Sequence, residues 1–387
     1  MSIRITREVC RILLLAPEGM AGGIATWTRH LLKYTDHQLI DYHVINTSKF
    51  YDTLGKRLGI RGGLCGVRDS IKRLANIISQ VYRFRPHAVY FTCAPSIGFI
   101  VRDMPYMLLL RLLRKKYIVH FRGGRLNYFF GRNAIERFIV RWALGGALIL
   151  IAITRAVEDK AKEIFGPDKV CYLPNMIDDE LVSIFPEKVI KPAGTNTEPM
   201  RVLHVAWQAP EKGSLELVDA LGKVKSPFLC DLVGDIAVEN RRLIQDKIRL
   251  KGLEGKVAIT GKKSGDELND YFKKADLFVF PSHNEGFPNV ILEAMASGLP
   301  ILASDVGNIR EMIDAEGVSP AGMLLDRVNP IDVDELAEKI DLLLRNYQLR
   351  MDFSRNGRER VRNSYTASKV VPQLEQKIIE TIENRTR

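Results

Sequence analysis

The stretch from 282 to 300 reads SHNEGFPNVILEAMASGLP, and it follows the short apolar run Leu277–Phe280. The apolar run predicts a buried strand, and the pattern from Pro288 to Ala296 predicts a helix that ends at Gly298. The next apolar run, Pro300–Ala303, predicts a second strand. A strand, a helix and another strand in close succession indicate a parallel sheet with helices on its faces.

The same alternation continues through the 387 residues of the chain. In the first half it predicts strands at Val9–Leu15, Tyr42–Ile45, Ala88–Thr92, Tyr117–His120 and Leu148–Ile153, and helices at Ile24–Tyr34 and Ser70–Phe84. In the second half it predicts strands at Arg201–Val205, Phe228–Val233 and Val257–Thr260, and helices at Leu215–Val224, Glu239–Lys251 and Gly265–Ala275. The chain is therefore expected to belong to the α/β class, with two doubly wound domains.

A change of composition marks the expected domain boundary. Between 186 and 199 the periodic pattern gives way to Pro, Gly, Thr and Asn, which are residues of turns and linkers. We therefore expect a first domain at 1–185, a linker at 186–199 and a second domain at 200–369. Ligands of open parallel sheets bind outside the carboxyl ends of the strands, so two facing domains predict a ligand site in a central cleft.

The composition is that of an ordinary globular protein, with 46% hydrophobic and 27% charged residues. The five cysteines are scattered without CxxC spacing, which predicts neither a zinc site nor a disulfide framework and indicates a reducing compartment. The apolar run Ile12–Ala16 is too short for the core of a signal peptide. The candidate membrane span Trp142–Thr154 carries no charge but is shorter than the about 20 residues of a membrane helix, so we expect a cytoplasmic protein.

The formal net charge of +11 is concentrated in the first half of the chain. Residues 1–180 hold 28 Lys and Arg against 15 Asp and Glu, and Val101–Arg141 alone holds ten basic residues and two acidic ones. Three interpretations remain open: a solvated basic surface, an anionic membrane or lipid-phosphate acceptor, and nucleic acid. Few aromatic residues lie between the basic ones, which makes nucleic acid the weakest of the three. The second interpretation would place the protein peripherally at the inner face of a membrane.

Two carboxylates give the stretch from 282 to 300 its chemical interest. Glu285 is expected in the loop and Glu293 inside the helix, about 10 Å apart at 1.5 Å per helical residue. Between them, N–H groups of the turn and of the helix start can bind an anion. Carboxylates also accept hydrogen bonds from sugar hydroxyls, so the stretch is suited to a nucleotide diphosphate sugar. Ordinary surface charge is the alternative, and the surrounding turn and helix signals argue against it.

Three other loops follow predicted strands. Gly22 and Gly23 allow close approach of a ligand at a helix start, although their spacing matches neither a Walker motif nor GxGxxG. Lys212 is expected at a strand-to-helix turn, where it is either a phosphate-binding cation or a solvated turn residue. His120 closes a strand before the basic, Gly-rich loop Phe121–Arg125, either as a catalytic group or as a packed histidine.

An Asp-x-Asp sequence, Asp332-Val333-Asp334, has a form that can hold a metal-bound diphosphate. It opens the predicted helix Glu335–Leu344, and N-capping of that helix explains the acidic residues. We therefore predict no metal site.

These motifs resemble family 4 of the retaining glycosyltransferases, which has the GT-B fold of two Rossmann-like domains. The spacing Glu285-x7-Glu293, followed by Ser304-Asp-Val-Gly-Asn-Ile-Arg-Glu311, is the specific part of the resemblance. Weaker similarities occur in the family's order at Gly22–Gly23, Leu173–Asp178, Pro210–Gly213 and Gly322–Ile340. The resemblance therefore covers nearly the whole chain.

The resemblance implies a site for a nucleotide diphosphate sugar, with a UDP-sugar as the first expectation. The implied donor-binding residues are Gly22, Gly23, Gly286, Phe287, Pro288, Asn289 and Glu293. The implied catalytic residues are His120, Lys212 and Glu285.

In the implied roles, Glu293 hydrogen-bonds the ribose, Glu285 holds the donor sugar, and Lys212 neutralises the leaving diphosphate. His120 contacts the transferring sugar. Neither a metal nor a cofactor is implied, because a lysine and helix ends stabilise the departing charge. The segment 370–387 is expected to form a helix that crosses back to the first domain.

One departure from the family concerns the diphosphate clamp. The family has Gly-Arg where this chain has Ala206-Trp207, and an indole with a single N–H cannot replace a guanidinium. Either catalysis is weakened, or another cation takes the place of the arginine. The candidates from nearby loops, for phosphate or acceptor contacts, are Arg122, Arg125 and Arg310.

The sequence thus predicts a metal-independent, retaining glycosyltransferase that moves a sugar to a hydroxyl of a saccharide or lipid-linked acceptor in surface polysaccharide biosynthesis. No residue stands out as a covalent nucleophile, so front-face displacement is the implied chemistry. One alternative is a degenerate homologue that binds a sugar nucleotide or a partner without turnover. A nucleic-acid-binding protein is the remote alternative, and nucleic acid is not an expected partner.

Overall fold

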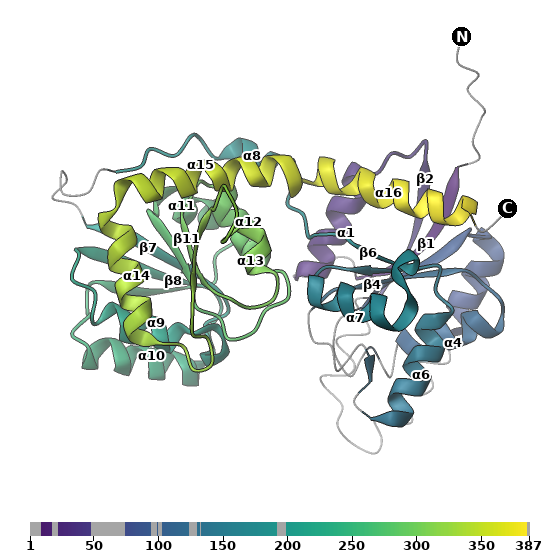
Figure 1. Ribbon diagram of the computed structural model, residues 1–387, viewed down its shortest axis with the longest axis horizontal. Helices are drawn as coiled ribbons and strands as arrows, with labels where there is room; N and C mark the ends of the chain where they lie inside the picture. Colours follow the sequence, from purple (N-terminus) through teal and green to yellow (C-terminus); the bar gives the residue numbers. More distant parts are fainter. Residues whose placement is uncertain are drawn as a thin grey trace, which may run out of the picture. The chain divides into compact units, whose positions relative to one another are not determined.

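The computed structural model describes residues 9–17, 22–47, 74–93, 99, 103–123, 130–131, 133–191 and 199–384. The chain divides into two compact units. The first unit combines Met1–Met176 with Ala367–Arg387, and the second is Ile177–Thr366. Helix α8 (Asp179–Ile184), in a stretch expected to close the first domain, is therefore part of the second unit. Figure 1 shows the elements of both units.

The first unit is built on a parallel sheet with the strand order β2-β1-β3-β4-β5-β6 in the described residues. Its strands are β1 (Cys10–Ala16), β2 (Ile40–Asn46), β3 (Ala88–Cys93), β4 (Tyr117–Phe121), β5 (Ile149–Ala152) and β6 (Val170–Tyr172). Its helices are α1 (Gly23–Tyr34), α4 (Met104–Leu112), α6 (Ala134–Gly145), α7 (Arg155–Phe165) and α16 (Ala367–Asn384), and residues 74–84 are also helical.

Alternating residues of β1 divide the first unit's core between the two faces of the sheet. Leu13 and Leu15 pack in a cluster that includes the buried residues of α4, α6 and α7. Ile12 and Leu14 pack in a second cluster, with the buried residues of α1 and α16. A strand buried on both faces is typical of a parallel sheet between two helical layers. The helix of the C-terminal segment, α16, thus belongs to the first unit and lies against α1.

The second unit has a parallel sheet with the order β12-β11-β10-β7-β8-β9. Its strands are β7 (Met200–Val205), β8 (Phe228–Val233), β9 (Val257–Gly261), β10 (Leu277–Phe280), β11 (Ile301–Ser304) and β12 (Gly322–Leu325). Its helices, besides α8, are α9 (Ser214–Leu221), α10 (Val238–Leu250), α11 (Asp266–Lys274), α12 (Asn289–Ala296), α13 (Ile309–Met312), α14 (Val333–Arg345) and α15 (Tyr347–Ser364).

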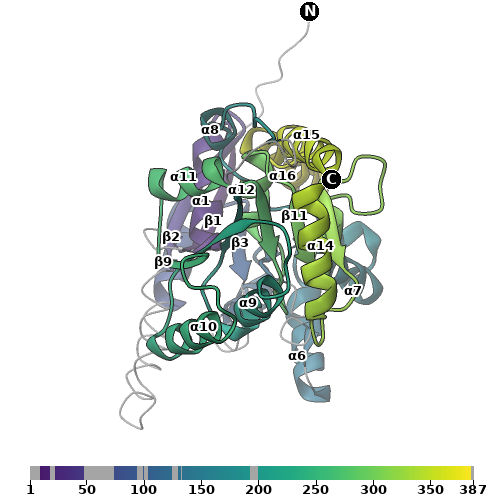
Figure 2. The same cartoon turned by 90° about the vertical axis from the view of Figure 1, so that its left-hand side faces the viewer.

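Two helical layers cover this second sheet, as Figure 2 shows from the side. Leu277 and Val279 of β10 pack in a cluster with the buried faces of α9, α10 and α14. The alternate residue Phe278 stacks between Phe280 and Phe272 of α11 on the other face. Alternate residues of a strand face opposite sides of its sheet, so α9 and α10 lie on one side and α11 lies on the other.

Both sheets are parallel and flanked by helices, which confirms the predicted α/β class with two doubly wound domains. The predicted ends of individual elements differ by a few residues. The helix α9, for example, ends at Leu221 rather than Val224, because Gly222 already takes the C-cap position. Within the described ranges, no helix is both long enough and apolar enough to cross a bilayer.

Candidate functional site

The strand order of the second unit reverses between β7 and β10, which makes the carboxyl ends of these two strands the expected ligand-binding point of the sheet. The loop after β7 contains Lys212, and the loop after β10 contains Glu285. The topology therefore brings these two predicted catalytic residues together, although they are far apart in the sequence.

Lys212 and Glu285 form an ion pair, with 2.6 Å between Nζ and Oε1. The side chains retain exposed fractions of 24% and 13%, so the pair is sheltered and still reachable. The fully buried Ser282 donates its hydroxyl hydrogen bond to the same oxygen of Glu285, at 3.0 Å. The carboxylate is thus held by a cation and a hydroxyl, and its second oxygen has no bond to either group.

The two loops are fixed to each other through the backbone. The backbone N–H of His283 donates to the Glu211 carbonyl at 3.0 Å. Lys212 ends the 3-10 turn Pro210–Lys212, and Gly213 follows with φ 71°, where a Cβ would lie 1.8 Å from the Pro281 carbonyl oxygen. Only glycine allows this approach, which sets the distance between the lysine and the glutamate.

The Gly286–Asn289 turn leads into α12. Phe287 is buried and packs edge-on against Tyr365, with 5.9 Å between ring centroids, so its side chain anchors the turn in the core. The sequence predicted Pro288 as the first residue of this helix, but the helix begins at Asn289 and Pro288 is its N-cap. Pro288 leaves the N-terminal N–H groups of the helix without a side-chain cap. Buried Oδ1 of Asn289 has no partner in the described residues. The helix start therefore keeps polar groups available for a ligand.

The turn is also held from the loop after β11. The Asn308 N–H donates to the Gly286 carbonyl at 2.9 Å. The neighbouring Gly307 has φ 62°, and a Cβ there would lie 2.4 Å from the Gly286 oxygen and 2.7 Å from the Glu285 oxygen. The backbone of both loops is thus in direct contact at this glycine.

Glu293 lies inside α12 and is largely shielded from solvent. Burial raises the pKa of its carboxyl group to about 7. Across the described part of the chain, no hydrogen bond or ion pair to this carboxyl group is present. An unpaired, shielded carboxyl group of this kind is suited to accept hydrogen bonds from ligand hydroxyls.

Arg310 of α13 is engaged at the surface. Its guanidinium binds Asp305 at 2.5 Å and also pairs with Glu316, and the hydrogen bond with Asp305 raises the pKa of Arg310. The predicted phosphate contact would require both carboxylates to release this side chain.

Trp207 follows β7 with 53% of its surface exposed. The next residue, Gln208, is fully buried and donates from its amide to the Ala206 and Val233 carbonyls at 3.0 and 2.9 Å. The exposed indole therefore lies next to a turn that the Gln208 amide holds, at the position where the resemblance implies an arginine.

In the first unit, Gly22 and Gly23 are exposed at the start of α1. Gly22 has φ 138°, a conformation that favours glycine, and α1 has no side-chain N-cap. The start of α1 therefore has N–H groups without a side-chain cap, and a binding role for Gly22 and Gly23 stays a prediction. The loop residues 18–21, between β1 and this helix, lie outside the described residues.

His120 is fully buried in the first unit. Its Nδ1 lies 2.8 Å from the Tyr90 hydroxyl and its Nε2 lies 3.4 Å from Nη1 of Arg122. Because a guanidinium can only donate, Nε2 accepts and the imidazole proton lies on Nδ1. Burial, and then the charge of Arg122, hold the pKa of His120 well below its usual value, so the ring is neutral. In this arrangement the ring faces protein groups rather than a sugar.

Arg122 completes this buried cluster. Its guanidinium lies over the Trp27 ring at 4.7 Å, and the Trp27 ring packs edge-on against His120 at 4.9 Å. Burial lowers the pKa of Arg122 to about 9, which leaves it charged at neutral pH. Its Nε is also buried and has no partner in the described residues. Arg125, the other basic candidate of this loop, lies outside the described residues.

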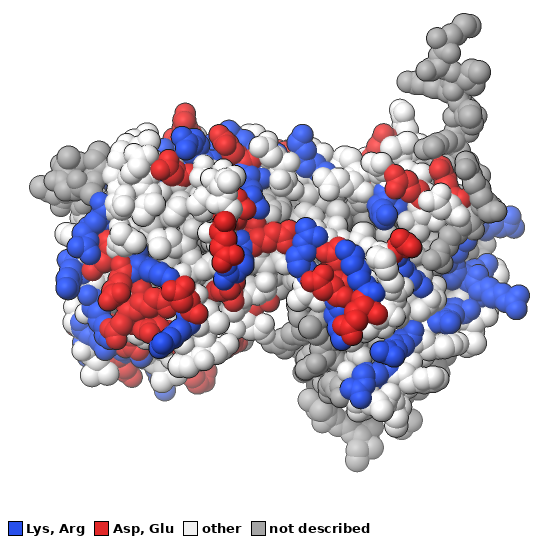
Figure 3. Space-filling view, in the orientation of Figure 1, with Lys and Arg blue, Asp and Glu red and all other residues white. Residues whose placement is uncertain are grey.

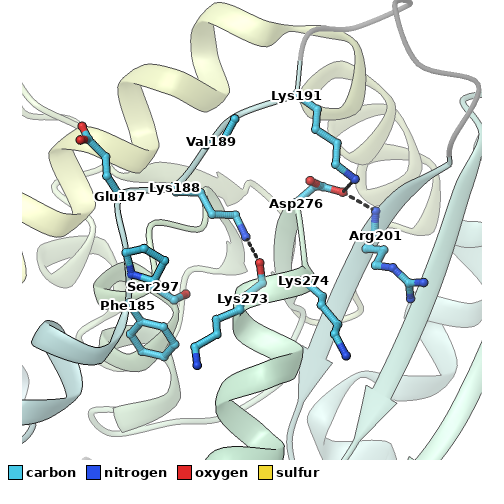
Figure 4. A pocket seen from close by; sticks show the side chains of 11 residues that line it. Phe185, Glu187, Lys188, Val189, Lys191, Arg201, Lys273, Lys274, Asp276 and Ser297 are labelled. Atoms are coloured by element: carbon cyan, nitrogen blue, oxygen red, sulfur yellow. Dashed lines mark hydrogen bonds and ion pairs between the residues drawn. The ribbon is translucent and has the colours of Figure 1, made fainter.

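A pocket of about 390 Å³ lies at the opposite edge of the second sheet, near the amino ends of β7 and β10 (Figure 4). Lys188 projects across it and donates to the Lys273 carbonyl at 2.6 Å and to the Ala275 carbonyl, which end α11. Burial lowers the pKa of Lys188 to about 8. Asp276 accepts from the Arg201 N–H at 2.8 Å. None of the predicted site residues lines this pocket.

The Asp332-Val333-Asp334 sequence behaves as a helix cap. The Asp332 carboxylate accepts from the N–H groups of Asp334 and Glu335 at 3.0 and 3.2 Å, at the start of α14. In the ranges that the structure describes, no cluster of three or more His, Cys, Asp or Glu residues could hold a metal ion.

Several residues of these sites were not predicted from the sequence. Ser282 begins the stretch from 282 to 300, but the sequence does not indicate that its hydroxyl binds the Glu285 carboxylate. Trp27 and Tyr90 enclose His120 from α1 and β3, and only the tertiary structure reveals this contact.

Residues 186–360, almost all of the second unit, match the model of the family described as glycosyl transferases group 1. The second unit is therefore similar to a group 1 glycosyl transferase domain. The capsular polysaccharide biosynthesis glycosyltransferase CapM of Staphylococcus aureus is 30% identical over 145 residues, which cover 37% of this chain and 36% of CapM. The chain spans about half the length of the curated relatives that it matches.

Solved glycosyl transferase structures share the fold over nearly the whole chain. A glycosyltransferase from Rickettsia africae ESF-5 matches with a TM-score of 0.73 and 17% identity, over 98% of this chain and 100% of that chain. Anabaena Alr3699/HepE in complex with UDP matches with a TM-score of 0.68 and 18% identity, over 97% and 100%. At this identity the likeness establishes the fold, which is the GT-B fold of two Rossmann-like domains, as predicted.

Proposed function

We propose that the protein transfers a sugar from a nucleotide diphosphate sugar to a hydroxyl group of an acceptor. The observation that carries the proposal is the sheltered pair of Lys212 and Glu285 at the reversal point of the second unit, which is similar to a group 1 glycosyl transferase domain. The uncapped start of α12 and the unpaired carboxyl group of Glu293 supply the remaining groups that such a donor requires.

In this proposal the donor exchanges partners with the ion pair. A diphosphate carries more charge than one carboxylate, so it replaces Glu285 on the Lys212 ammonium. The released Glu285 then accepts hydrogen bonds from the donor sugar, and Glu293 accepts from the ribose hydroxyls. The N–H groups of Gly286–Asn289 bind the diphosphate together with the positive end of α12.

The chemistry we propose needs no covalent enzyme intermediate. The acceptor hydroxyl attacks on the face that the diphosphate leaves, the leaving oxygen takes the hydroxyl proton, and configuration is retained. Lys212 stabilises the departing negative charge without a metal ion. From the first unit, Gly22 and Gly23 would offer N–H groups to phosphate.

The structure changes the proposed role of His120. Because its ring is enclosed, we assign it the positioning of Arg122, which keeps 9% of its surface exposed and is the residue of this cluster that we propose contacts the substrates. Arg310 is the weaker candidate for such a contact, because two carboxylates already bind it.

UDP is the first nucleotide to test, because the structural neighbour HepE was solved with UDP and with UDP-glucose. The acceptor we propose is a saccharide or a lipid-linked saccharide of surface polysaccharide biosynthesis, supported by the similarity to CapM. We propose that the protein acts in the cytoplasm.

Substitution of Lys212 tests the proposal. Lys212→Met is expected to lower turnover about 10²- to 10³-fold, the effect of removing one preorganised group that stabilises developing charge. Lys223→Met is the control, because Lys223 is an exposed lysine paired with Asp334 in the same unit. The donor is identified first by thermal shift with UDP, GDP and ADP, since a ligand at 100 times its Kd stabilises the fold by about 2.7 kcal/mol.

Equal turnover of Lys212→Met and Lys223→Met would overturn the assignment of the site. Wild-type protein that binds a nucleotide sugar but neither transfers nor hydrolyses it would show the degenerate form that the exposed Trp207 suggests. Loss of the UDP shift in both variants would indicate damage to the fold rather than to the site.

A further inference from the structure

The outer face of α6 in the first unit is apolar. Ile135 and Phe138 are 74% and 72% exposed, and Trp142 is 37% exposed. These residues follow one another at spacings of three and four, so they form one stripe along the helix. The inner face of α6 carries Val140, Ala143 and Leu144 and is already buried in the core. A surface helix usually turns polar residues outward, so this stripe calls for an explanation.

The end of α4 extends the apolar surface. Leu112 and Leu113 are 69% and 37% exposed there. The Arg111 guanidinium lies 4.6 Å above the Trp142 ring and joins the two helices, which also pack against each other. The α4–α6 patch, as we call it, consists of Leu112, Leu113, Ile135, Phe138 and Trp142. A contiguous exposed patch of large apolar residues marks an interaction surface.

Basic residues surround the α4–α6 patch. Arg137 and Arg141 lie on α6 next to the apolar stripe, and Arg114, Lys115 and Lys116 follow α4. Among the described residues, none of these five forms an ion pair. In Figure 3, Lys and Arg side chains gather along α6, whereas the acidic side chains nearby lie over α7. The patch therefore presents apolar groups and uncompensated positive charge together.

We propose that the α4–α6 patch docks on an anionic lipid bilayer. An interfacial helix lies in the membrane plane with its apolar face among the acyl chains and its basic residues at the headgroups. The amphipathic ring of Trp142 suits the boundary between these layers. Anionic lipid headgroups provide negative charge for the five basic residues, which form no ion pair among the described residues.

The other occupants fit the patch less well. A second copy of this chain, placed patch to patch, would bring two basic rims together, and their like charges would repel. Nucleic acid would satisfy the basic residues but leave Ile135 and Phe138 exposed to water. The bilayer satisfies both features at once.

Docking on a bilayer is independent of the proposed transfer reaction, because it uses no residue of the donor site. It would keep the first unit at the surface where a lipid-linked acceptor resides. Failure of vesicle binding would therefore leave the proposed reaction untouched, and loss of turnover would leave docking untouched.

Vesicle cosedimentation of the full chain tests the inference. Vesicles of phosphatidylcholine alone are compared with vesicles that also contain phosphatidylglycerol, at low and at physiological salt. Phe138→Glu is expected to lower the affinity for the anionic vesicles at least about tenfold, because it removes apolar burial and adds negative charge. Arg141→Ala is expected to lower it about fivefold, the equivalent of one basic residue near an anionic surface.

Matched controls come from α10 of the second unit. Leu250→Glu replaces an apolar residue that is 84% exposed, and Arg242→Ala removes an exposed arginine. Both are expected to bind vesicles like the wild type. All four positions are at the surface, and thermal unfolding confirms that each variant is folded.

Three results would overturn the inference. The first is equal binding of the wild type to neutral and anionic vesicles, and the second is an equal loss in the α6 and α10 variants. The third is a concentration-dependent dimer of the wild type that Phe138→Glu dissociates without any change in vesicle binding, which would identify a second copy as the occupant.

Discussion

The two units share a doubly wound architecture and differ in what covers the polar residues at their strand ends. In the second unit, Lys212 and Glu285 lie at the strand ends with part of their surface open. In the first unit, His120 is enclosed by Trp27 from α1, and Arg122 keeps only 9% of its surface exposed. The position of a polar residue in the topology is therefore similar in both units. What decides whether it can reach a ligand is the side chain that a helix packed on the sheet places over it.

The largest effect is expected from the side chain that encloses the first cluster. Trp27→Ala should destabilise the first unit by about 3–5 kcal/mol, because it removes a buried aromatic ring against Tyr90, His120 and Arg122. Trp207→Ala, in the second unit, should cost less than about 1 kcal/mol, because that ring is half exposed. Denaturant unfolding, with hydrogen exchange in α1 and β4, measures the difference. Similar costs at the two tryptophans would break the comparison.

A smaller effect is expected from the pH dependence of two carboxyl groups, one in each unit. Burial raises the pKa of Glu293 in α12 and of Glu375 in α16 to about 7. A raised carboxyl pKa means that the folded state binds the proton more tightly than the unfolded state does. The associated stability is therefore complete below the unfolded pKa of about 4.5 and is lost as the pH rises through about 7.

Replacement by glutamine removes this loss. Relative to the wild type, Glu293→Gln and Glu375→Gln should each gain about 1–3 kcal/mol of stability between about pH 4.5 and about pH 7.5. Nucleotide affinity then separates the two. UDP binding should strengthen as Glu293 ionises near pH 7 in the wild type and in Glu375→Gln, and should become independent of pH in Glu293→Gln. A pH-independent affinity in the wild type would remove Glu293 from the donor site.

The smallest effect is expected at two helix caps, one in each unit. Thr154 caps α7 by accepting from the Val157 N–H at 3.3 Å, and Asn346 caps α15 by accepting from the Leu349 N–H at 3.0 Å. Each substitution by alanine should cost about 1 kcal/mol, and Thr154→Ser and Asn346→Asp should retain most of the cap. Hydrogen exchange should increase in the substituted helix alone. An equal increase in both helices would mean that the two units unfold together.

The sequence was sufficient for the architecture because the strands are buried on both faces and carry continuous apolar runs. The strand β8 has the predicted limits, Phe228–Val233, and the wound order follows from parallel strands joined by helices. The pairing of Lys212 with Glu285 was also within reach, because both follow strands whose carboxyl ends meet in the sheet. Element ends were less accurate, because caps depend on single residues such as Gly222.

The prediction was incomplete where the covering side chains matter. A histidine at a strand end gave no indication that Trp27 and Tyr90 would enclose it, since these contacts join residues far apart in the sequence. The engagement of Arg310 by Asp305 and Glu316 was equally invisible, because surface pairs depend on loop geometry. The basic residues around α6 were counted correctly, but only the structure shows which apolar residues lie exposed between them.

Gly307 has a consequence for engineering this protein. The backbone of its loop touches the Glu285–Gly286 turn, and one added carbon would come within 2.4 Å of the Gly286 oxygen. The space between these two loops is therefore too small for a methyl group. We expect a larger residue at 307 to displace the Glu285–Gly286 turn while the core of the sheet stays in place. The size of this one side chain would then control the alignment of the proposed donor site.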